Sequence, residues 1–271
     1  MITNRRPASR RYLMCPPEYY TVSYAINPWM RPDEPTDPAL AFRQWSELRD
    51  IYLRLGHDVR QIEPVRGLPD MVYAANGATV IGGRVLGARF RYPERAAEAT
   101  AYLDWFRSSG YEDLHEAEQI NEGEGDFLFT DRKILAGYGF RSDLAAAAEA
   151  ASVFGLPVTS LRLVNERFYH LDTALCVLDS STAMYYPAAF DDAGLLALAA
   201  EFTELIEAKD EDADVLGLNA VSDGKHVVLP SAAAGLATSL RERGFEPIGV
   251  DMSELLKGGG GPKCCTLELR P

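Results

Sequence analysis

The feature that most constrains the fold is a recurring pair of short apolar strands. Each copy begins with a polar residue and continues as an apolar strand, a tight turn and a second apolar strand. The copies span 76–90, 125–140, 171–187 and 219–230. A fifth copy forms if CCTLELRP at the C-terminus pairs with RYLMCPP near the N-terminus. The repeat is about 50 residues long, a length typical of propellers and solenoids.

Helical patterns fill the intervals between these strand pairs. They span 94–109, 143–154, 189–209 and 231–244, the last beginning with Ser231. The first unit has its helix over 38–56, with Asp37 as the predicted N-cap and Pro38 at the first helical position. The pattern therefore predicts two strands and a helix in each unit, within a single domain over residues 1–271.

Composition narrows the expected partners and the compartment. The 271 residues include 27 Lys and Arg against 40 Asp and Glu, for a net charge of −13. Nucleic acid and anionic membranes need a basic surface, so neither is expected as a partner. No apolar run approaches the ~20 residues of a membrane span, and we expect no signal peptide. Four cysteines without framework spacing fit a reducing compartment, so we expect a cytoplasmic protein.

The polar residues at the strand starts include groups that can bind or react. They are Asn76, Asp126, His170 with Asp172, Asn219 and Cys264. If the first strands of the units surround a common axis, these side chains converge on one pocket. The alternative is a generic α/β protein in which the spacing carries no functional meaning.

Cys264 is notable because it follows a glycine-rich loop, GGGGPK. Glycines let a loop approach a ligand closely, and Lys263 would favour the thiolate. The alternative is that Cys264 is only a small buried hydrophobic residue. His170 and Asp172 alternate in YHLDT, which predicts that both lie on the same face of a strand. A cysteine and a histidine are the minimum for nucleophilic catalysis, although a lone histidine is often structural.

A second group of polar residues is acidic. Glu122, Glu124 and Asp126 lie within NEGEGDFLF, and Asp70 lies in LPDMVYAAN. This acidic stretch is either an exposed turn or part of a site. No His or Cys set has zinc-ligand spacing and no phosphate-binding glycine motif follows a strand, so we expect neither a metal nor a cofactor. An acidic pocket with a thiol and an imidazole suits hydrolysis or transfer at a cationic carbon, such as that of a guanidinium group.

The chain resembles the guanidine-modifying enzymes, a superfamily of arginine deiminases, dimethylarginine dimethylaminohydrolases, arginine dihydrolases and amidinotransferases. The resemblance rests on LPDMVYAAN, ARFRYPERAAE, EGEGD, YHLDT and GGPKCCT, in this order along nearly the whole chain. It implies an α/β fold, a five-bladed α/β propeller (pentein) of pseudo-fivefold ββαβ-type repeats. The pattern is most similar to that of arginine dihydrolases and dimethylargininases.

The resemblance also implies catalytic roles. Cys264, rather than Cys265, matches the nucleophile, and His170 matches the general acid and base. The catalytic acid is either Glu122 or Glu124, because EGEGD stands where the family has EGGD or DGGD.

The remaining candidates match or adjoin substrate-binding positions of the family. They are Asp70, Asp126, Asp172, Asn27, Asn76, Arg89 and Arg141. The aspartates correspond to the end of the site that holds the guanidinium group, and the arginines to the end that holds the substrate's carboxylate. The two asparagines match the arginine dihydrolases, whereas deiminases and dimethylaminohydrolases have an acid at position 76.

These residues imply a cysteine-dependent hydrolase that acts on the guanidinium group of arginine through a covalent Cys-thiouronium intermediate. Asn76 favours an arginine dihydrolase, because an amide can pair with both a guanidinium and a neutral ureido group. The alternatives are a dimethylarginine dimethylaminohydrolase, an amidinotransferase and a non-catalytic arginine-binding protein. The expected partner is a small cationic guanidino substrate, arginine or methylated arginine, and the sequence leaves a homo-oligomer open.

Overall fold

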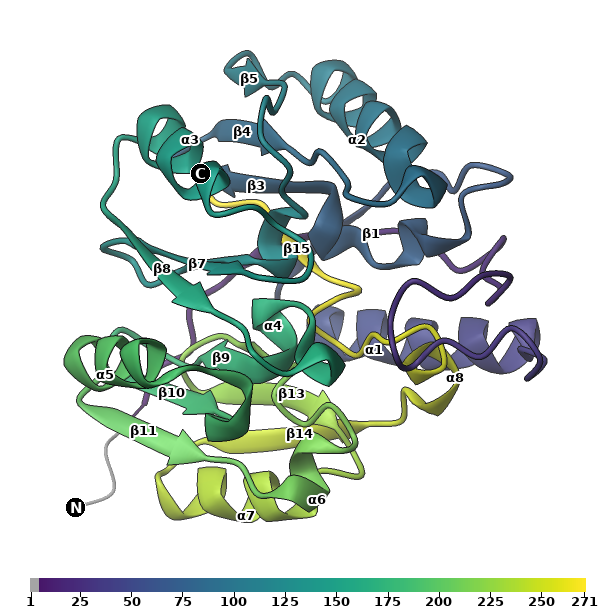
Figure 1. Cartoon of the computed structure of the whole chain (residues 1–271). Helices are drawn as coiled ribbons and strands as arrows, with labels where there is room; N and C mark the ends of the chain where they lie inside the picture. Colours follow the sequence, from purple (N-terminus) through teal and green to yellow (C-terminus); the bar gives the residue numbers. More distant parts are fainter. Residues whose placement is uncertain (1–4) are drawn as a thin grey trace.

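The strands form five separate three-stranded sheets in the computed structural model, which describes residues 5–271 (Figure 1). In every sheet the middle strand runs antiparallel to one neighbour and parallel to the other. The sheets are β15-β1-β2 (Leu267–Glu268, Arg11–Met14, Asp58–Gln61), β3-β4-β5 (Ala78–Ile81, Arg84–Gly87, Leu114–His115), β6-β7-β8 (Phe127–Phe129, Ile134–Tyr138, Val158–Arg162), β9-β10-β11 (Leu175–Val177, Thr182–Tyr185, Glu204–Glu207) and β12-β13-β14 (Val221–Ser222, His226–Pro230, Glu246–Val250). The molecule therefore has a mixed α/β fold with five small sheets.

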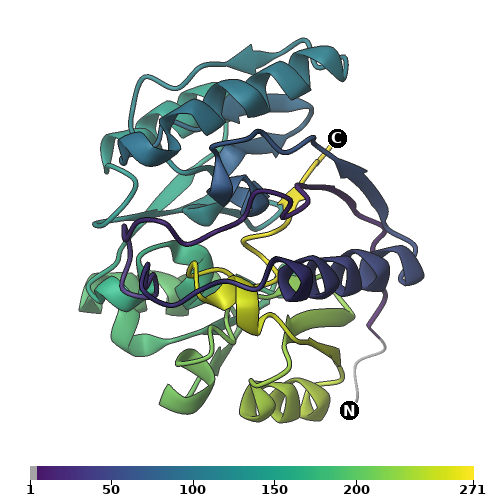
Figure 2. The same ribbon diagram turned by 90° about the vertical axis from the view of Figure 1, so that its right-hand side faces the viewer.

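The two ends of the chain meet in the first of these sheets. β15 pairs antiparallel with β1, so that Tyr12 lies opposite Glu268 and Leu13 opposite Leu267. The predicted pairing of the chain ends is confirmed. Figures 1 and 2 show the C-terminal segment passing through the middle of the molecule to reach this sheet.

A longer helix connects the middle strand of each sheet to the strand parallel with it. These helices are α1 (Pro38–Arg54), α2 (Ala96–Ser108), α3 (Ala145–Phe154), α5 (Asp192–Glu201) and α7 (Ala234–Glu242). Parallel neighbours need such a crossover, since a tight turn cannot join them. Asp37 caps α1 as predicted, because its carboxylate accepts hydrogen bonds from the amides of Ala39 and Leu40. In Figure 1, α2, α3, α5 and α7 lie on the outside of the molecule.

Two helix predictions are wrong in their bounds. The helix predicted over 189–209 ends at Glu201, and Glu204–Glu207 forms β11 beside β10. The helix predicted to begin at Ser231 begins at Ala234, without a side-chain cap. The strand-pair pattern also omits the third strand of every sheet, which the ββαβ repeat implied by the family resemblance includes.

Short helical turns precede several of the first strands. They are α4 (Leu171–Ala174), α6 (Asp210–Ala213), α8 (Ser253–Leu256) and the 3-10 turns η1 (Pro69–Val72), η2 (Ala74–Gly77), η4 (Gly123–Gly125) and η5 (Glu166–Phe168). Two further 3-10 turns, η3 (Pro93–Arg95) and η6 (Pro187–Ala189), precede the helices α2 and α5. His170 precedes α4 and Asp172 lies within it, so the prediction that both lie on one strand face is wrong. The polar residues nevertheless stand shortly before β3, β6, β9, β12 and β15, as the repeat predicted.

Apolar side chains fill the space between the sheets and their helices. In α1, Trp45, Leu48 and Tyr52 are fully buried, and they belong to the same apolar cluster as Cys264 and Cys265. Figure 2 shows α1 beside the C-terminal segment, which agrees with this packing. The late cysteines and α1 thus share one packed apolar cluster.

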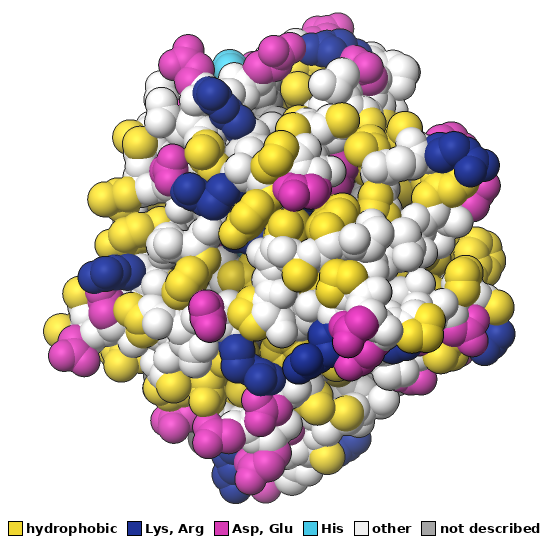
Figure 3. Space-filling view, turned by 45° about the vertical axis from the view of Figure 1, so that its right-hand side comes forward, with side chains coloured by type: hydrophobic (Ala, Val, Ile, Leu, Met, Phe, Trp, Pro, Cys, Tyr) yellow, Lys and Arg dark blue, Asp and Glu magenta, His cyan; other side chains and the backbone are white. Residues whose placement is uncertain are grey.

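Charged side chains of both signs lie on the face of the molecule drawn in Figure 3, with several Lys and Arg in a row below the middle and Asp and Glu beneath them. Across residues 5–271, no helix has the length and apolar character needed to cross a membrane.

Candidate active site

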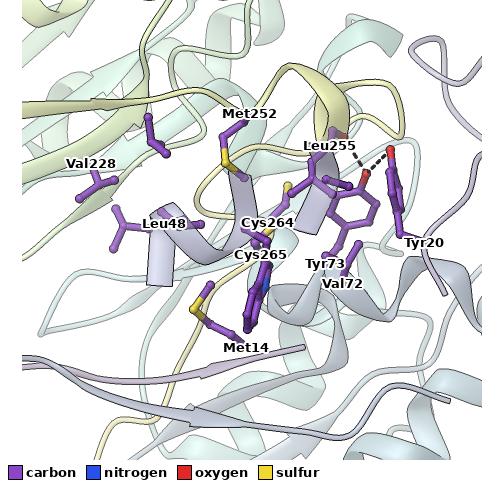
Figure 4. Close-up of a cluster of buried hydrophobic side chains, with 14 of the residues drawn as sticks. Met14, Tyr20, Leu48, Val72, Tyr73, Val228, Met252, Leu255, Cys264 and Cys265 are labelled. Atoms are coloured by element: carbon purple, nitrogen blue, oxygen red, sulfur yellow. Dashed lines mark hydrogen bonds between the residues drawn. The ribbon is translucent and has the colours of Figure 1, made fainter. Parts of the chain in front are cut away.

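Cys264 is carried by the glycine-rich loop between α8 and β15. The Tyr73 ring packs against this loop, and a Cβ atom on Gly258 or on Gly260 would collide with it. Tyr73 is itself fixed, because its hydroxyl donates a hydrogen bond of 2.7 Å to the Leu255 carbonyl (Figure 4). The glycines therefore allow the loop to fold tightly onto Tyr73 and bring Cys264 into the interior.

Two side chains contact the Cys264 sulfur. Asp172 Oδ2 lies 3.3 Å from Sγ and accepts a hydrogen bond from the thiol. Asn219 Nδ2 lies 3.1 Å from Sγ and donates a hydrogen bond to it. Burial, and after it the neighbouring Asp172, raise the pKa of the Cys264 thiol well above its ordinary value. Burial also raises the pKa of Asp172 to about 6. The neutral thiol is thus the favoured form in the absence of a ligand.

The imidazole of His170 is oriented by a buried carboxylate. His170 Nε2 lies 2.8 Å from Glu122 Oε2, and the same oxygen accepts a hydrogen bond of 2.7 Å from Arg141. Burial opposes the ionisation of Glu122, but Arg141 and His170 outweigh it and hold the pKa of this carboxyl below its ordinary range. His170 Nδ1 is buried and has no hydrogen-bond partner within residues 5–271. One ring nitrogen is therefore anchored and the other is available to a ligand.

Glu124 belongs to a different network. Its carboxylate pairs with Lys263 Nζ at 2.7 Å and with Arg270, and it accepts a hydrogen bond from the Glu268 amide. Burial opposes ionisation, but these two cations lower the pKa of Glu124. Because the Lys263 ammonium group is directed at Glu124, the expectation that Lys263 favours the thiolate of the next residue is not met.

Asp126 is buried with both carboxylate oxygens engaged by the protein. Oδ2 accepts hydrogen bonds from the amide and hydroxyl of Ser142, and Oδ1 accepts one from the Leu171 amide. Leu171 follows His170 directly, so this contact fixes the backbone that carries the imidazole.

Asp70 and Asn76 lie around a buried guanidinium group that the sequence analysis missed, that of Arg95. Arg95 forms a two-pronged ion pair with Glu98 at 2.8 and 3.0 Å, and donates to Asn76 Oδ1 at 2.9 Å. Its Nε lies 3.8 Å from Asp70 Oδ2, which accepts a hydrogen bond from the Tyr24 hydroxyl. Arg95 is the second arginine of the R-x-x-x-P-x-R pattern in ARFRYPERAAE, so the signal was present in the sequence.

The structure separates the other binding candidates. Asn27 lies at the edge of the group, with Nδ2 3.3 Å from the Tyr169 hydroxyl and 3.1 Å from the Gly258 carbonyl. Arg89 lies outside it, because its side chain is exposed and donates to the Glu118 carbonyl. The pairing of Arg89 with Arg141 in one subsite is therefore not supported by the geometry.

The group as a whole is enclosed. All its members except Asn27 are at most 3% exposed: Asp70, Asn76, Arg95, Glu122, Arg141, His170, Asp172, Asn219 and Cys264. Part of the cover comes from the segment before α1, where the Ile26 carbonyl accepts a hydrogen bond from Arg141. The arrangement combines a thiol, an oriented imidazole and buried acids, which can perform nucleophilic attack and proton transfer away from water. Within residues 5–271, no group of three or more His, Cys, Asp or Glu side chains is arranged to hold a metal ion.

A comparison with known protein families identifies the family of this chain. The family model described as N,N dimethylarginine dimethylhydrolase, eukaryotic, matches residues 25–271. The chain belongs to this family. The resemblance to guanidine-modifying enzymes is thereby confirmed.

Individual relatives point to two activities. The chain is 56% identical to the N(G),N(G)-dimethylarginine dimethylaminohydrolase of Mycobacterium tuberculosis, over 98% of this chain and 88% of that protein. It is 37% identical to AgrE, a bifunctional arginine dihydrolase/ornithine cyclodeaminase of a Nostoc species, over 96% of this chain but only 38% of that protein. Among solved structures, the N-terminal domain of the cyanobacterial arginine dihydrolase ArgZ, in a cysteine-to-serine variant bound to substrate, superposes with a TM-score of 0.92. That domain is 35% identical, and the match covers 97% of this chain and 98% of that one.

Proposed function

We propose that this protein is a cysteine-dependent hydrolase of the guanidinium group of arginine or a methylated arginine. One observation carries the proposal. Of the six buried side-chain nitrogen and oxygen atoms without a partner in residues 5–271, three are Asp70 Oδ1, His170 Nδ1 and Asp172 Oδ1. Buried polar atoms are nearly always hydrogen-bonded, so a cluster of unpartnered ones suits a polar ligand. Two carboxylate oxygens and an imidazole fit a cation rich in N–H donors.

Cys264 supplies the nucleophile in this proposal. The thiol proton passes to the His170 imidazole before attack, and a bound cation favours that loss by offsetting the negative charge that forms on the sulfur. Sγ then forms a bond to the guanidinium carbon, while Asp70 and Asp172 balance the positive charge of the substrate. The family resemblance and the Asp172 contact with Sγ support this assignment.

His170 transfers the protons of both half-reactions. It gives a proton to the departing amine as the C–N bond breaks, which leaves the thiouronium adduct on Cys264. It then takes a proton from a water molecule that attacks the same carbon, and the C–S bond breaks with its electron pair returning to Sγ. Glu122, in contact with Nε2, stabilises the protonated imidazole between these steps.

Asn76 supports an arginine dihydrolase that hydrolyses arginine to ornithine, ammonia and carbon dioxide. Its Oδ1 is held by Arg95 at 2.9 Å, whereas its Nδ2 has only a 3.4 Å contact with the Glu122 carbonyl. An amide N–H can donate to the oxygen of a neutral ureido group, which a carboxylate at this position cannot. The citrulline-like intermediate would therefore stay bound for a second hydrolysis. The similarity to AgrE and ArgZ agrees with this proposal.

Dimethylarginine dimethylaminohydrolase activity is the second candidate. The 56% identical mycobacterial relative carries that name, and this is the specific observation in its favour. The first half-reaction is the same, except that dimethylamine leaves. Hydrolysis of the adduct in the second half-reaction then releases citrulline.

Replacing Asn76 by aspartate separates one round of hydrolysis from two. In Asn76→Asp, a carboxylate replaces the amide donor, so citrulline should accumulate from arginine and the ornithine yield should fall at least about tenfold. Quantification of both amino acids by mass spectrometry measures the effect. An ornithine yield equal to that of the wild type would remove Asn76 from this role.

A product analysis tests the proposed function itself. The purified protein is incubated separately with arginine, dimethylarginine and agmatine, with Cys264→Ala as the blank. Ornithine and ammonia from arginine are expected, whereas citrulline and dimethylamine from dimethylarginine would favour the second candidate. Agmatine lacks the carboxylate and tests whether that group is required. Turnover only with an added acceptor amine would indicate an amidinotransferase, and turnover of none of the compounds would contradict the proposal.

We also propose that the five sheets are the blades of one α/β propeller formed by a single domain over residues 1–271. Each first strand starts beside the group of polar residues around Cys264, which supports a common axis. The four cysteines are all free, and this agrees with the cytoplasmic location that the sequence predicts.

A further inference from the structure

Asn219 is a polar residue at a strand start to which the proposed function gives no role. It lies two residues before β12 and is completely buried. Its Oδ1 accepts hydrogen bonds of 3.0 Å from the backbone amides of both Gly261 and Cys264. Its Nδ2 donates to the Asp172 carbonyl and to the Cys264 sulfur, both at 3.1 Å. Every hydrogen-bonding position of the side-chain amide is therefore used.

These contacts determine the orientation of the amide group. Two backbone N–H groups face one end of the side chain, so that end must be the oxygen. If the amide were turned over, its NH2 group would face both donors and its oxygen would face the Asp172 carbonyl. The N–H group that points at Sγ is therefore imposed by the Gly261 and Cys264 backbone.

The Cys264 sulfur consequently lies between a hydrogen-bond donor, Asn219, and an acceptor, Asp172. The two have opposite effects on the stability of the thiolate. Asp172, at 3.3 Å, accepts a hydrogen bond from the thiol, but its carboxylate repels the sulfur once the thiol has lost its proton. Asn219 is neutral and donates to the sulfur in both states, and a hydrogen bond to an anion is stronger than one to a neutral thiol. The Asn219 contact thus favours the charged form at the step where Asp172 disfavours it.

We propose that Asn219 is a catalytic residue that fixes the glycine loop through Oδ1 and stabilises the Cys264 thiolate through Nδ2. The proposal rests on the proposed function in taking Cys264 as the nucleophile. Asn219 then has two roles. It fixes the position of the sulfur, and it raises the fraction of Cys264 that is present as the reactive thiolate.

Alkylation of Cys264 in the absence of substrate tests this role. Each variant is treated with iodoacetamide across a pH series, and mass spectrometry of the peptide follows Cys264 separately from Cys15, Cys176 and Cys265. In Asn219→Asp the two backbone contacts of Oδ1 can persist, while a second oxygen replaces the donor to Sγ. The midpoint of the pH profile should rise by at least about one pH unit. Under saturating substrate, kcat should fall about tenfold or more while KM changes less.

A charge-matched control separates this effect from the added carboxylate. Asn165→Asp introduces the same change at a partly buried residue whose side chain accepts only from the Arg167 amide. Its pH profile should match that of the wild type.

A second variant keeps the test valid if Asn219→Asp misfolds or if its new carboxyl group is protonated. Asn219→Ser removes the N–H donor without adding charge, and its pH midpoint should rise in the same direction. If the midpoint stays at the wild-type value in the folded Asn219 variants while kcat falls, the role is structural only and the proposal is overturned. Because alkylation needs no substrate, a shifted midpoint in a protein that hydrolyses no guanidine would contradict the proposed function alone.

Discussion

Replacement of Cys264 by alanine is expected to reduce guanidine hydrolysis by about 10⁴-fold or more, whereas the same change at Cys265 should leave most of the activity. Loss of a nucleophile removes the covalent pathway altogether, and such losses are among the largest in enzyme kinetics. Cys264 Sγ forms hydrogen bonds with Asp172 and Asn219, while Cys265 is fully buried and forms a hydrogen bond with neither of these side chains. Initial rates of product formation from arginine and dimethylarginine measure both variants.

The neighbouring cysteine is a stringent control for this prediction. Both cysteines lie in the same segment and the same cluster (Figure 4), so damage to packing should affect Cys265→Ala at least as much as Cys264→Ala. Thermal unfolding of the two variants measures that damage. Equal loss of activity in both, or retained activity in Cys264→Ala, would be incompatible with Cys264 as the nucleophile.

The strand pairs could be predicted from the sequence because their signal is local. Short apolar runs around a tight turn, such as Ala78–Ile81 and Arg84–Gly87, specify a hairpin without knowledge of the rest of the chain. The pairing of Arg11–Met14 with Leu267–Glu268 is long-range, and only the repeat made it predictable. The periodic pattern thus predicted which distant strand pairs with β1, which the sequence of a single strand cannot do.

The third strands carry no comparable signal. Asp58–Gln61 is largely polar, and Glu204–Glu207 has only two apolar residues between two glutamates. Each strand pairs in parallel with a preceding strand of its sheet. In the interval 189–209, the helical periodicity of the first half extends into the strand and hides the boundary. Context outweighs propensity in such short edge segments.

The identity of the acids at the site could be predicted from the sequence, but their partners could not. The sequence does not show which basic side chains would neutralise these acids, and the protein supplies several. Arg141 pairs with Glu122, Arg95 with Glu98, and Lys263 and Arg270 with Glu124. Arg95 was missed for the same reason, because only the fold determines which arginine of a motif is buried.

The ambiguity between Glu122 and Glu124 can be resolved by a matched pair of substitutions. Glu122→Gln should lower kcat about 10³-fold, because a neutral amide cannot stabilise the protonated imidazole of His170. Glu124→Gln should keep kcat within about tenfold of the wild type, since Glu124 contacts neither His170 nor Cys264. Its main effect should be on stability, a loss of about 3 kcal/mol in the free energy of unfolding, because Lys263 and Arg270 lose their buried partner.

Steady-state kinetics and urea unfolding of both variants distinguish a loss of catalytic rate from a loss of stability. Glu122→Gln should also lose stability, since Arg141 is left with a neutral neighbour in a buried position. The rates must therefore be measured without urea, under conditions where both variants are folded. The decisive comparison is the ratio of the two kcat values. If Glu124→Gln loses as much kcat as Glu122→Gln, the 2.8 Å contact between Glu122 and His170 does not mark the catalytic acid, and the Lys263–Glu124 pair beside Cys264 must take part in the reaction.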